Sequence, residues 1–226
     1  MKNAMPPLLL LTRPEHAARR FADEAAHLGL EVLISPVLRI VPLDHDRVRL
    51  AGARGMVFTS ENAVRFAGPG QGRPAICVGP RSARVAQEAG FDAVAGPGDA
   101  ARLEPMLRDL GPGWLHPHGR HIAKRLPVPG MAVYDQVAQP LSDAALAALV
   151  GTRPIALPLF SPRTARILSA QMAGVTAPLW LVAISAAAEQ AWRGDIGRDH
   201  IARLAVAPTP DAPGTLRGLA EVLCQA

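Results

Sequence analysis

A short apolar strand that passes directly into a helix occurs twice in this sequence, and this repeat restricts the possible folds. In the first copy, Met56-Val57-Phe58 is followed by Thr59 and Ser60 and then by apolar residues at helical spacing. In the second, Leu157-Pro158-Leu159-Phe160 is followed by Ser161 and Pro162. Serine and threonine are typical N-cap residues, and proline suits the first helical position. A further strand-to-helix segment follows each copy, so the sequence indicates two versions of one α/β plan.

Two proline-bounded segments of alternating residues, Pro36–Pro42 and Met131–Pro140, bracket one of these versions. Proline at the ends suits an edge or linker strand. Alternating helices and buried apolar runs predict parallel sheets. The fold class is therefore predicted as α/β, with two doubly wound, flavodoxin-like domains joined by a two-stranded β-ladder. The predicted parts are a discontinuous first domain (1–36 and 141–226), an inserted second domain (43–130) and linker strands (37–42 and 131–140).

The composition argues against several classes of protein. An apolar fraction of 49% is ample for hydrophobic cores. The formal net charge is +5, but the arginines are scattered, whereas a nucleic-acid binder would show a basic stripe. Dispersed arginines suit a small polyanionic ligand, with a solvated surface as the alternative. Cys77 and Cys224 have neither metal nor disulfide spacing, which fits a reducing cytoplasm. No apolar run reaches the roughly 18 residues of a membrane span.

Hydroxyl residues and arginines gather where the predicted strands end. In doubly wound folds, ligands bind outside the carboxyl ends of the strands, and helix N-termini bind carboxylates or phosphates. The side chains concerned could also be plain helix caps, or arginines that contact solvent. The candidate binding residues are Arg13, Thr59, Ser60, Arg81, Ser82, Ser161 and Ser185.

No metal or nucleotide motif accompanies these residues. His116-Pro117-His118 and His121 lack carboxylate or thiol partners and are interpreted as part of a strand-end loop, with a short helix over His118–Leu126. Tyr134 is the only tyrosine and lies in the second linker segment. It is either a packing residue of an alternating strand or a phenol that relays a proton.

Taken in order along the chain, several short motifs resemble those of the uroporphyrinogen-III synthase family. Each motif is weak alone, and their order and spacing carry the resemblance over nearly the whole chain. The motifs are Leu11-Thr12-Arg13-Pro14, Val57-Phe58-Thr59-Ser60-Glu61-Asn62-Ala63-Val64, Val78-Gly79-Pro80-Arg81-Ser82-Ala83, Ala89-Gly90-Phe91, Val133-Tyr134, Phe160-Ser161-Pro162, Ala183-Ile184-Ser185 and Ala207-Pro208-Thr209.

The resemblance implies a hydro-lyase that cyclises hydroxymethylbilane, an octacarboxylate, to uroporphyrinogen III. Ring D is inverted through a spiro intermediate and water is lost, without metal or cofactor. The family has two α/β domains joined by a two-stranded ladder, and its linker tyrosine corresponds to Tyr134, the candidate catalytic acid. At Ser185 many members carry two further threonines, where this chain has alanines.

The alternative is a non-catalytic module of the same fold that binds a tetrapyrrole or another polyanion. The intact Tyr134 favours the enzyme, and the simplified helix start at Ser185 favours the module. The partners expected are the small-molecule substrate alone, with no nucleic acid and no membrane. The resemblance implies a cytoplasmic monomer and allows a transient contact with hydroxymethylbilane synthase.

Overall fold

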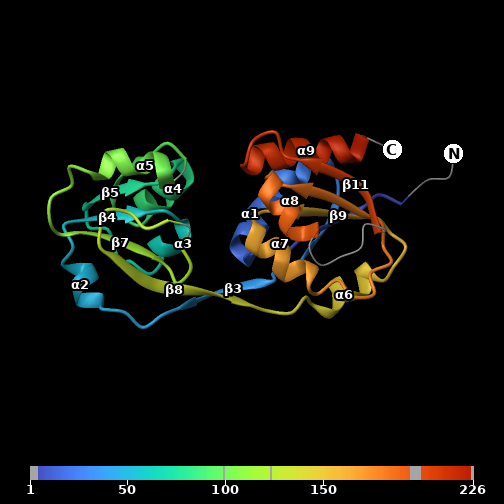
Figure 1. Cartoon of the computed structure of the whole chain (residues 1–226), viewed down its shortest axis with the longest axis horizontal. Helices are drawn as coiled ribbons and strands as arrows, with labels where there is room; N and C mark the ends of the chain where they lie inside the picture. The colour runs from blue at the N-terminus through green and yellow to red at the C-terminus, as the bar shows by residue number, and fades with distance from the viewer. Residues whose placement is uncertain (1–4, 99, 123, 194–199, 225–226) are drawn as a thin grey trace. The chain divides into compact units, whose positions relative to one another are not determined.

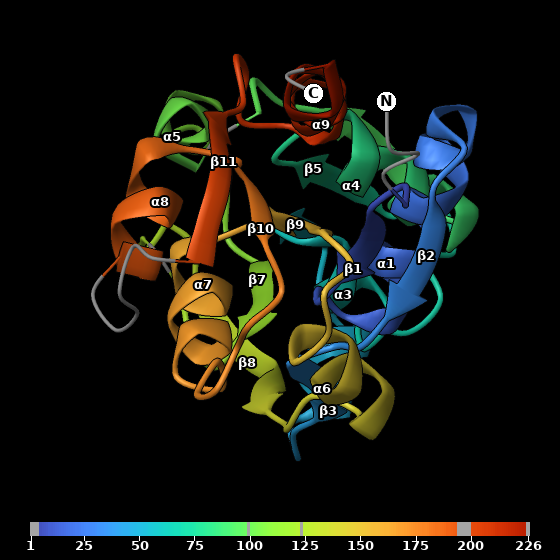
Figure 2. The same ribbon diagram turned by 90° about the vertical axis from the view of Figure 1, so that its right-hand side faces the viewer.

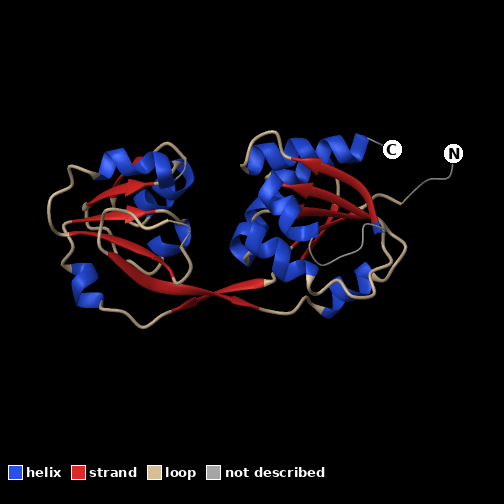
Figure 3. Cartoon of the chain, viewed as in Figure 1, coloured by secondary structure: helices blue, strands red, loops and turns tan. Residues whose placement is uncertain are grey.

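The computed structural model describes residues 5–98, 100–122, 124–193 and 200–224. The chain forms two compact units (Figure 1). The first unit comprises Met1–Arg39 and Ala138–Ala226, and the second comprises Ile40–Val137. Each unit contains one sheet with helices packed against it, as the colouring by secondary structure shows (Figure 3).

The first unit is built on a five-stranded parallel sheet in the order β11-β10-β9-β1-β2. Numbered by appearance within the unit, this order is 2-1-3-4-5, which is that of flavodoxin-like folds. Its strands are β1 (Leu8–Leu11), β2 (Glu31–Ile34), β9 (Ile155–Leu159), β10 (Leu179–Ala183) and β11 (Ile201–Val206). Its helices are α1 (Glu15–Ala25), the 3₁₀ turn η1 (Ala26–Leu28), α6 (Asp143–Leu149), α7 (Pro162–Ser169), α8 (Ala186–Arg193) and α9 (Ala212–Cys224).

Helices cover both faces of the first sheet, which explains why its central strands are continuous apolar runs (Figure 2). On one face, Leu149, Leu168 and Trp192 of α6, α7 and α8 are buried in one core. On the other face, Phe21 of α1 and Leu219 of α9 are buried in a second core.

The other sheet has six strands in the order β3-β8-β7-β4-β5-β6, and all of it except the first residues of β3 and the last residue of β8 lies in the second unit. If β4 to β8 are numbered 1 to 5, the parallel strands read from β6 to β8 have the order 3-2-1-4-5. The strand order of this unit therefore differs from that of the first. Its strands are β3 (Leu38–Pro42), β4 (Gly55–Phe58), β5 (Pro74–Cys77), β6 (Asp92–Ala95), β7 (Trp114–Gly119) and β8 (Gly130–Ala138). Its helices are α2 (Arg47–Ala51), α3 (Glu61–Val64), α4 (Pro80–Glu88) and α5 (Ala100–Leu107).

Two cores hold the second sheet. Ala63 of α3 and Ala83 of α4 pack with Phe58 on one face, and Leu103 and Leu107 of α5 pack on the other. Small residues on α3 and α4 allow these helices to approach the sheet closely. Cys77 is fully buried in this region, and burial raises the pKa of its thiol to about 12.

The strands β3 and β8 belong to the second sheet and lie next to each other at its edge. The amide of Leu43 donates to the carbonyl of Val133 at 3.0 Å. The amide of Gln139 donates to the carbonyl of Val37, also at 3.0 Å. The treatment of residues 37–42 and 131–140 as separate linkers stays a prediction.

Some local predictions are confirmed, and one is wrong. Ser60 and Ser161 are N-caps, as their position after the strands predicts. The helix expected over His118–Leu126 is not found in the described part of that segment. Instead β7 continues to Gly119, because its last residues pair with β8. None of the helices in the described residues is long and apolar enough to cross a membrane.

Candidate active site

The strand order of each sheet identifies where a ligand is expected. In open α/β sheets, the binding crevice lies at the carboxyl ends of two neighbouring strands whose connections run in opposite directions. In the first unit this switch point is between β1 and β9, and in the second it is between β4 and β7. Candidate residues follow β1, β9 and β4, so the two switch points are considered in turn.

In the second unit, the phenol of Tyr134 lies with two polar side chains of the segment that follows β4. Tyr134 is only 4% exposed, and burial raises the pKa of its phenol. Side-chain hydrogen bonds with Ser60 and Asn62 act in the opposite direction on this pKa. Hydrogen bonds that lower a phenol pKa favour the phenolate, so these two side chains oppose the larger effect of burial. At neutral pH the phenol is protonated.

The ring of Tyr134 is held on both sides. The Phe66 ring stacks on it, with centroids 5.9 Å apart and planes inclined by 21°. On another side, a Cβ atom on Gly119 would lie 2.8 Å from the Cε2 and Cζ atoms of the tyrosine. Tyr134 pairs with Gly119, the last residue of β7, at a register shift between the two strands. The phenol therefore has a fixed position at the carboxyl end of this sheet.

The Ser60 and Asn62 side chains are themselves positioned by the start of α3. The Ser60 hydroxyl accepts a hydrogen bond from the amide of Asn62 at 3.2 Å, as an N-cap does. Asn62 is 9% exposed, and its Oδ1 atom is buried with no hydrogen-bond partner among the described residues. A buried acceptor of this kind is costly unless a donor reaches it.

Thr59 does not join Tyr134 but bonds to a histidine across the switch point. Its Oγ1 atom lies 2.9 Å from Nε2 of His116, in β7. His116 is 2% exposed, and burial, with a smaller effect of the nearby His118, lowers its pKa to about 4. The imidazole is therefore neutral at physiological pH. His116 and His118 also line a cavity of about 490 Å³ together with Arg120 and Arg125.

Arg81 and Ser82, both in the first turn of α4, are placed differently from each other. The Nε atom of Arg81 donates to Glu61 at 2.7 Å, so its charge is compensated by a neighbour of Ser60. The Ser82 side chain is buried in the helix, with the residue 6% exposed. We call Tyr134, Ser60 and Asn62 the Tyr134 cluster. Arg81 borders this cluster through its ion pair with Glu61, whereas the Ser82 side chain is buried.

At the switch point of the first unit, an arginine lies over an aromatic ring. The guanidinium carbon of Arg13 is 4.2 Å from the centroid of Phe160, a cation–π distance. Phe160 also packs edge-on against Phe21, with centroids 4.8 Å apart. The neighbouring Thr12 is fully buried, and its hydroxyl oxygen has no hydrogen-bond partner among the described residues.

The two candidate serines of the first unit serve as helix caps. The Ser161 hydroxyl accepts from the amide of Thr164 at 3.1 Å and donates to the hydroxyl of the same residue at 2.9 Å. The Ser185 hydroxyl accepts from the amide of Ala188 at 3.3 Å. The helices α7 and α8 that they precede are in contact with each other.

Sequence reasoning did not assign His116 and Asn62 to the site. The histidine pair was noticed as a motif, but its pairing with Thr59 depends on β7 lying beside β4. The described residues contain no group of three or more histidine, cysteine, aspartate or glutamate side chains arranged to hold a metal ion.

A family model matches most of the chain. The family model "Uroporphyrinogen-III synthase HemD" matches residues 19–217. The crystal structure of uroporphyrinogen-III synthetase from Helicobacter pylori 26695 aligns with a TM-score of 0.64 at 15% identity, covering 96% of this chain and 100% of that one. A mutant uroporphyrinogen III synthase from the extremely thermophilic bacterium Thermus thermophilus aligns with a TM-score of 0.49 at 18% identity, covering 97% of this chain and 100% of that chain. A search of curated protein sequences found no match.

The structural likeness to the Helicobacter protein supports the fold, and the family match supports the activity. The match extends over most of the chain and includes the strand-end motifs of the second unit and Tyr134. The chain therefore belongs to the uroporphyrinogen-III synthase family.

Proposed function

We propose that the Tyr134 cluster of the second unit supplies the acid that starts the family's reaction. Members of this family are hydro-lyases that cyclise hydroxymethylbilane to uroporphyrinogen III in heme biosynthesis, and this is the activity of the chain. The observation that carries the assignment is a buried phenol held between Phe66 and Gly119 at the carboxyl end of the sheet. Because burial raises its pKa, the phenol keeps its proton at neutral pH and can donate it to an acceptor in the substrate.

The acid step follows from the relative basicities. The C–O bond of the hydroxymethyl group breaks, and the departing hydroxide takes the phenol proton to leave as water. Water has a pKa of about 15.7, so hydroxide is the stronger base even though burial raises the pKa of Tyr134. The phenolate left behind is favoured by the hydrogen bonds with Ser60 and Asn62, which lower the phenol pKa. It regains a proton when the macrocycle loses one at the end of ring closure.

The rest of the catalysis is positioning, because ring D must attack through its substituted carbon. Holding reacting groups in place can supply about 7–11 kcal/mol of the barrier. The unpartnered Oδ1 of Asn62 is suited to accept a pyrrole N–H. Carboxylates would bind at the helix starts of α7 and α8 and at Arg13. We also propose that Thr59, Ser60, Arg81 and Ser82 bind the substrate through their side chains. Ser161 and Ser185 would contribute through the helix starts that they cap.

The test is a single-turnover reaction with freshly generated hydroxymethylbilane, followed by separation of isomers I and III. Tyr134→Phe keeps the ring between Phe66 and Gly119 and removes only the acid. We expect isomer III formation to slow by about a hundredfold, a typical contribution of general acid catalysis. Tyr134→Ala, which also removes the packing, should be worse.

Equal rates for the wild-type and Phe proteins would remove Tyr134 from the mechanism. Failure of the wild-type protein to produce isomer III would instead favour the non-catalytic binding module. Action as a cytoplasmic monomer, with at most a transient contact with hydroxymethylbilane synthase, belongs to the same proposal. Sedimentation of the purified protein tests the monomer directly.

A further inference from the structure

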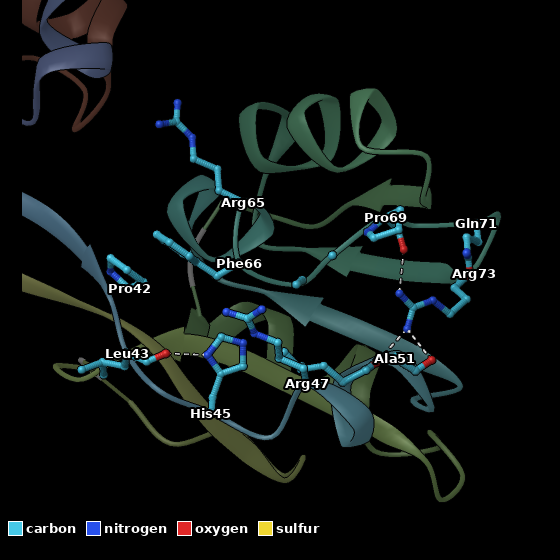
Figure 4. A pocket seen from close by; sticks show the side chains of 13 residues that line it. Pro42, Leu43, His45, Arg47, Ala51, Arg65, Phe66, Pro69, Gln71 and Arg73 are labelled. Atoms are coloured by element: carbon cyan, nitrogen blue, oxygen red, sulfur yellow. Dashed lines mark hydrogen bonds between the residues drawn. The ribbon is translucent and has the colours of Figure 1, made fainter.

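The second unit contains another cavity, which none of the residues proposed for the reaction lines. It measures about 430 Å³, within the range of small-molecule sites. Its walls come from the segment between β3 and the end of α2 and from the segment that follows α3 (Figure 4). The lining residues are Pro42, Leu43, His45, Arg47, Leu50, Ala51, Arg65, Phe66, Ala67, Gly68, Pro69, Gln71 and Arg73.

The charged side chains that line this cavity are all basic. It contains three arginines and a histidine, and no carboxylate. Among the described residues, neither Arg47 nor Arg65 has an ion-pair partner. Figure 4 shows Arg47 on the side of the pocket that carries His45 and Phe66, whereas Arg65 extends outward from the rim. The uncompensated Arg47 guanidinium beside the cavity favours an anionic occupant.

A third arginine makes this wall rigid. The Arg73 guanidinium donates to five backbone carbonyls in and beside the two segments that line the cavity, at 2.8 to 3.4 Å. Its positive charge is thus held without a carboxylate partner, and Figure 4 shows some of these bonds. Because the segments are tied together by one side chain, the cavity exists before a ligand enters. Preorganisation of this kind reduces the entropy lost on binding.

The remaining lining is apolar and includes a flat surface. Leu43, Leu50 and Ala67 provide aliphatic contacts, and Phe66 provides an aromatic ring that is half-buried. Aromatic rings prefer offset-stacked or edge-to-face partners, so a planar group is favoured here over a branched aliphatic one.

We propose that this cavity is a binding site for a compact aromatic carboxylate of one or two rings. The carboxylate would pair with the guanidinium of Arg47, and the ring would contact Phe66 and the aliphatic wall. The site is independent of the assignment of Tyr134 as the acid, since binding here requires neither the phenol nor the reaction.

The probe is 2-naphthoate, with uncharged 2-naphthamide as the ligand of equal shape. Binding is followed by the amide shifts of the ¹⁵N-labelled protein, without substrate. Naphthoate should shift the amides of Phe66, Ala67 and Gly68, and should bind at least tenfold more tightly than naphthamide. Arg47→Gln should weaken naphthoate at least tenfold and leave naphthamide unchanged.

Arg49→Gln is the matched control, because Arg49 lies on the same helix and does not line the cavity. Ala51→Leu places bulk into the cavity from an exposed position and should abolish binding without changing any charge. The proposal is overturned if naphthoate does not bind, if the amide binds equally well, or if Arg47→Gln and Arg49→Gln behave alike.

Discussion

At the carboxyl end of the second sheet, Thr59 and Ser60 are bonded to His116 and Tyr134, whereas at the same end of the first sheet Ser161 and Ser185 bond to their own helices. The sequences of the two regions look alike, with a strand followed by hydroxyl residues in each. The difference arises from the neighbouring strands. In the second unit, β7 and β8 bring a histidine and a tyrosine to this edge. In the first, the corresponding edge carries Phe160 and Arg13.

Under the proposed function, this contrast corresponds to a division of labour between the two units. A buried neutral histidine, a buried phenol and an unpartnered amide oxygen make the second unit sensitive to individual side chains. The first unit offers backbone N–H groups at helix starts, which persist when a side chain is replaced.

The largest difference expected between the two units is in how the free energy of unfolding of the second unit depends on pH. The pKa of His116 is about 4 in the folded protein and about 6.5 when unfolded, so the unfolded state binds more protons between these values. The stability is fully present above about pH 6.5 and falls toward pH 4, by about 3 kcal/mol from this group. Urea unfolding of the wild-type and His116→Gln proteins across that range measures it.

Trp114 of β7 reports on the second unit in a Trp180→Phe, Trp192→Phe background, since those two tryptophans belong to the first. Carboxylates titrate in the same pH range in both proteins, so the difference between the two curves isolates the histidine. Parallel curves between pH 4 and 6.5 would show that His116 does not distinguish the two units.

The next effect concerns the partner of this histidine. Thr59→Val keeps the shape of the side chain and removes the bond to Nε2 of His116. Leaving a buried polar group without a partner costs roughly 1–3 kcal/mol, so we expect a loss of about 2 kcal/mol in the second unit. Denaturant unfolding with the Trp114 reporter measures it. Adding His116→Leu should recover part of the loss, because both polar partners are then absent.

Much of the fold could be predicted because its signals are local. The N-caps Ser60 and Ser161 each depend on a few neighbouring residues. Parallel sheets followed from apolar runs that alternate with helices. The helix expected at His118–Leu126 failed because the pairing of β7 with β8 overrides local propensity there.

The candidate site was predictable in its residue types but not in its connections. Thr59 and His116 are 57 positions apart in the sequence, and their contact depends on β4 pairing with β7. Nothing local indicates that order, since β5 and β6 intervene in the chain. Likewise, the position of Tyr134 beside Ser60 depends on a register shift between β7 and β8. The sequence therefore identified Thr59 and Tyr134, but it did not identify His116 as a partner, because that contact depends on the pairing of strands far apart in the chain.

A smaller effect tests whether the position of the phenol matters as well as its presence. In Gly119→Ala, the added Cβ would lie 2.8 Å from the ring of Tyr134, so the ring must shift. A misplacement of about 1 Å can cost up to a hundredfold in rate, and we expect about a tenfold slower formation of isomer III. Single-turnover kinetics measures this, with circular dichroism as the control for folding. An unchanged rate would mean that the phenol need not be held in place.

The smallest effect is expected in the first unit. Ser161→Ala removes the hydroxyl that accepts from the Thr164 amide, and loss of an N-cap costs about 1 kcal/mol. Isomer III formation should stay near the wild-type rate, because the backbone N–H groups of α7 remain. Trp180 and Trp192 report on this unit in a Trp114→Phe background, so the stability change can be assigned to it. If Ser161→Ala instead slows isomer III formation as much as Tyr134→Phe does, the hydroxyl binds the substrate. The two sheet edges would then contribute alike, and the division of labour between them would have to be abandoned.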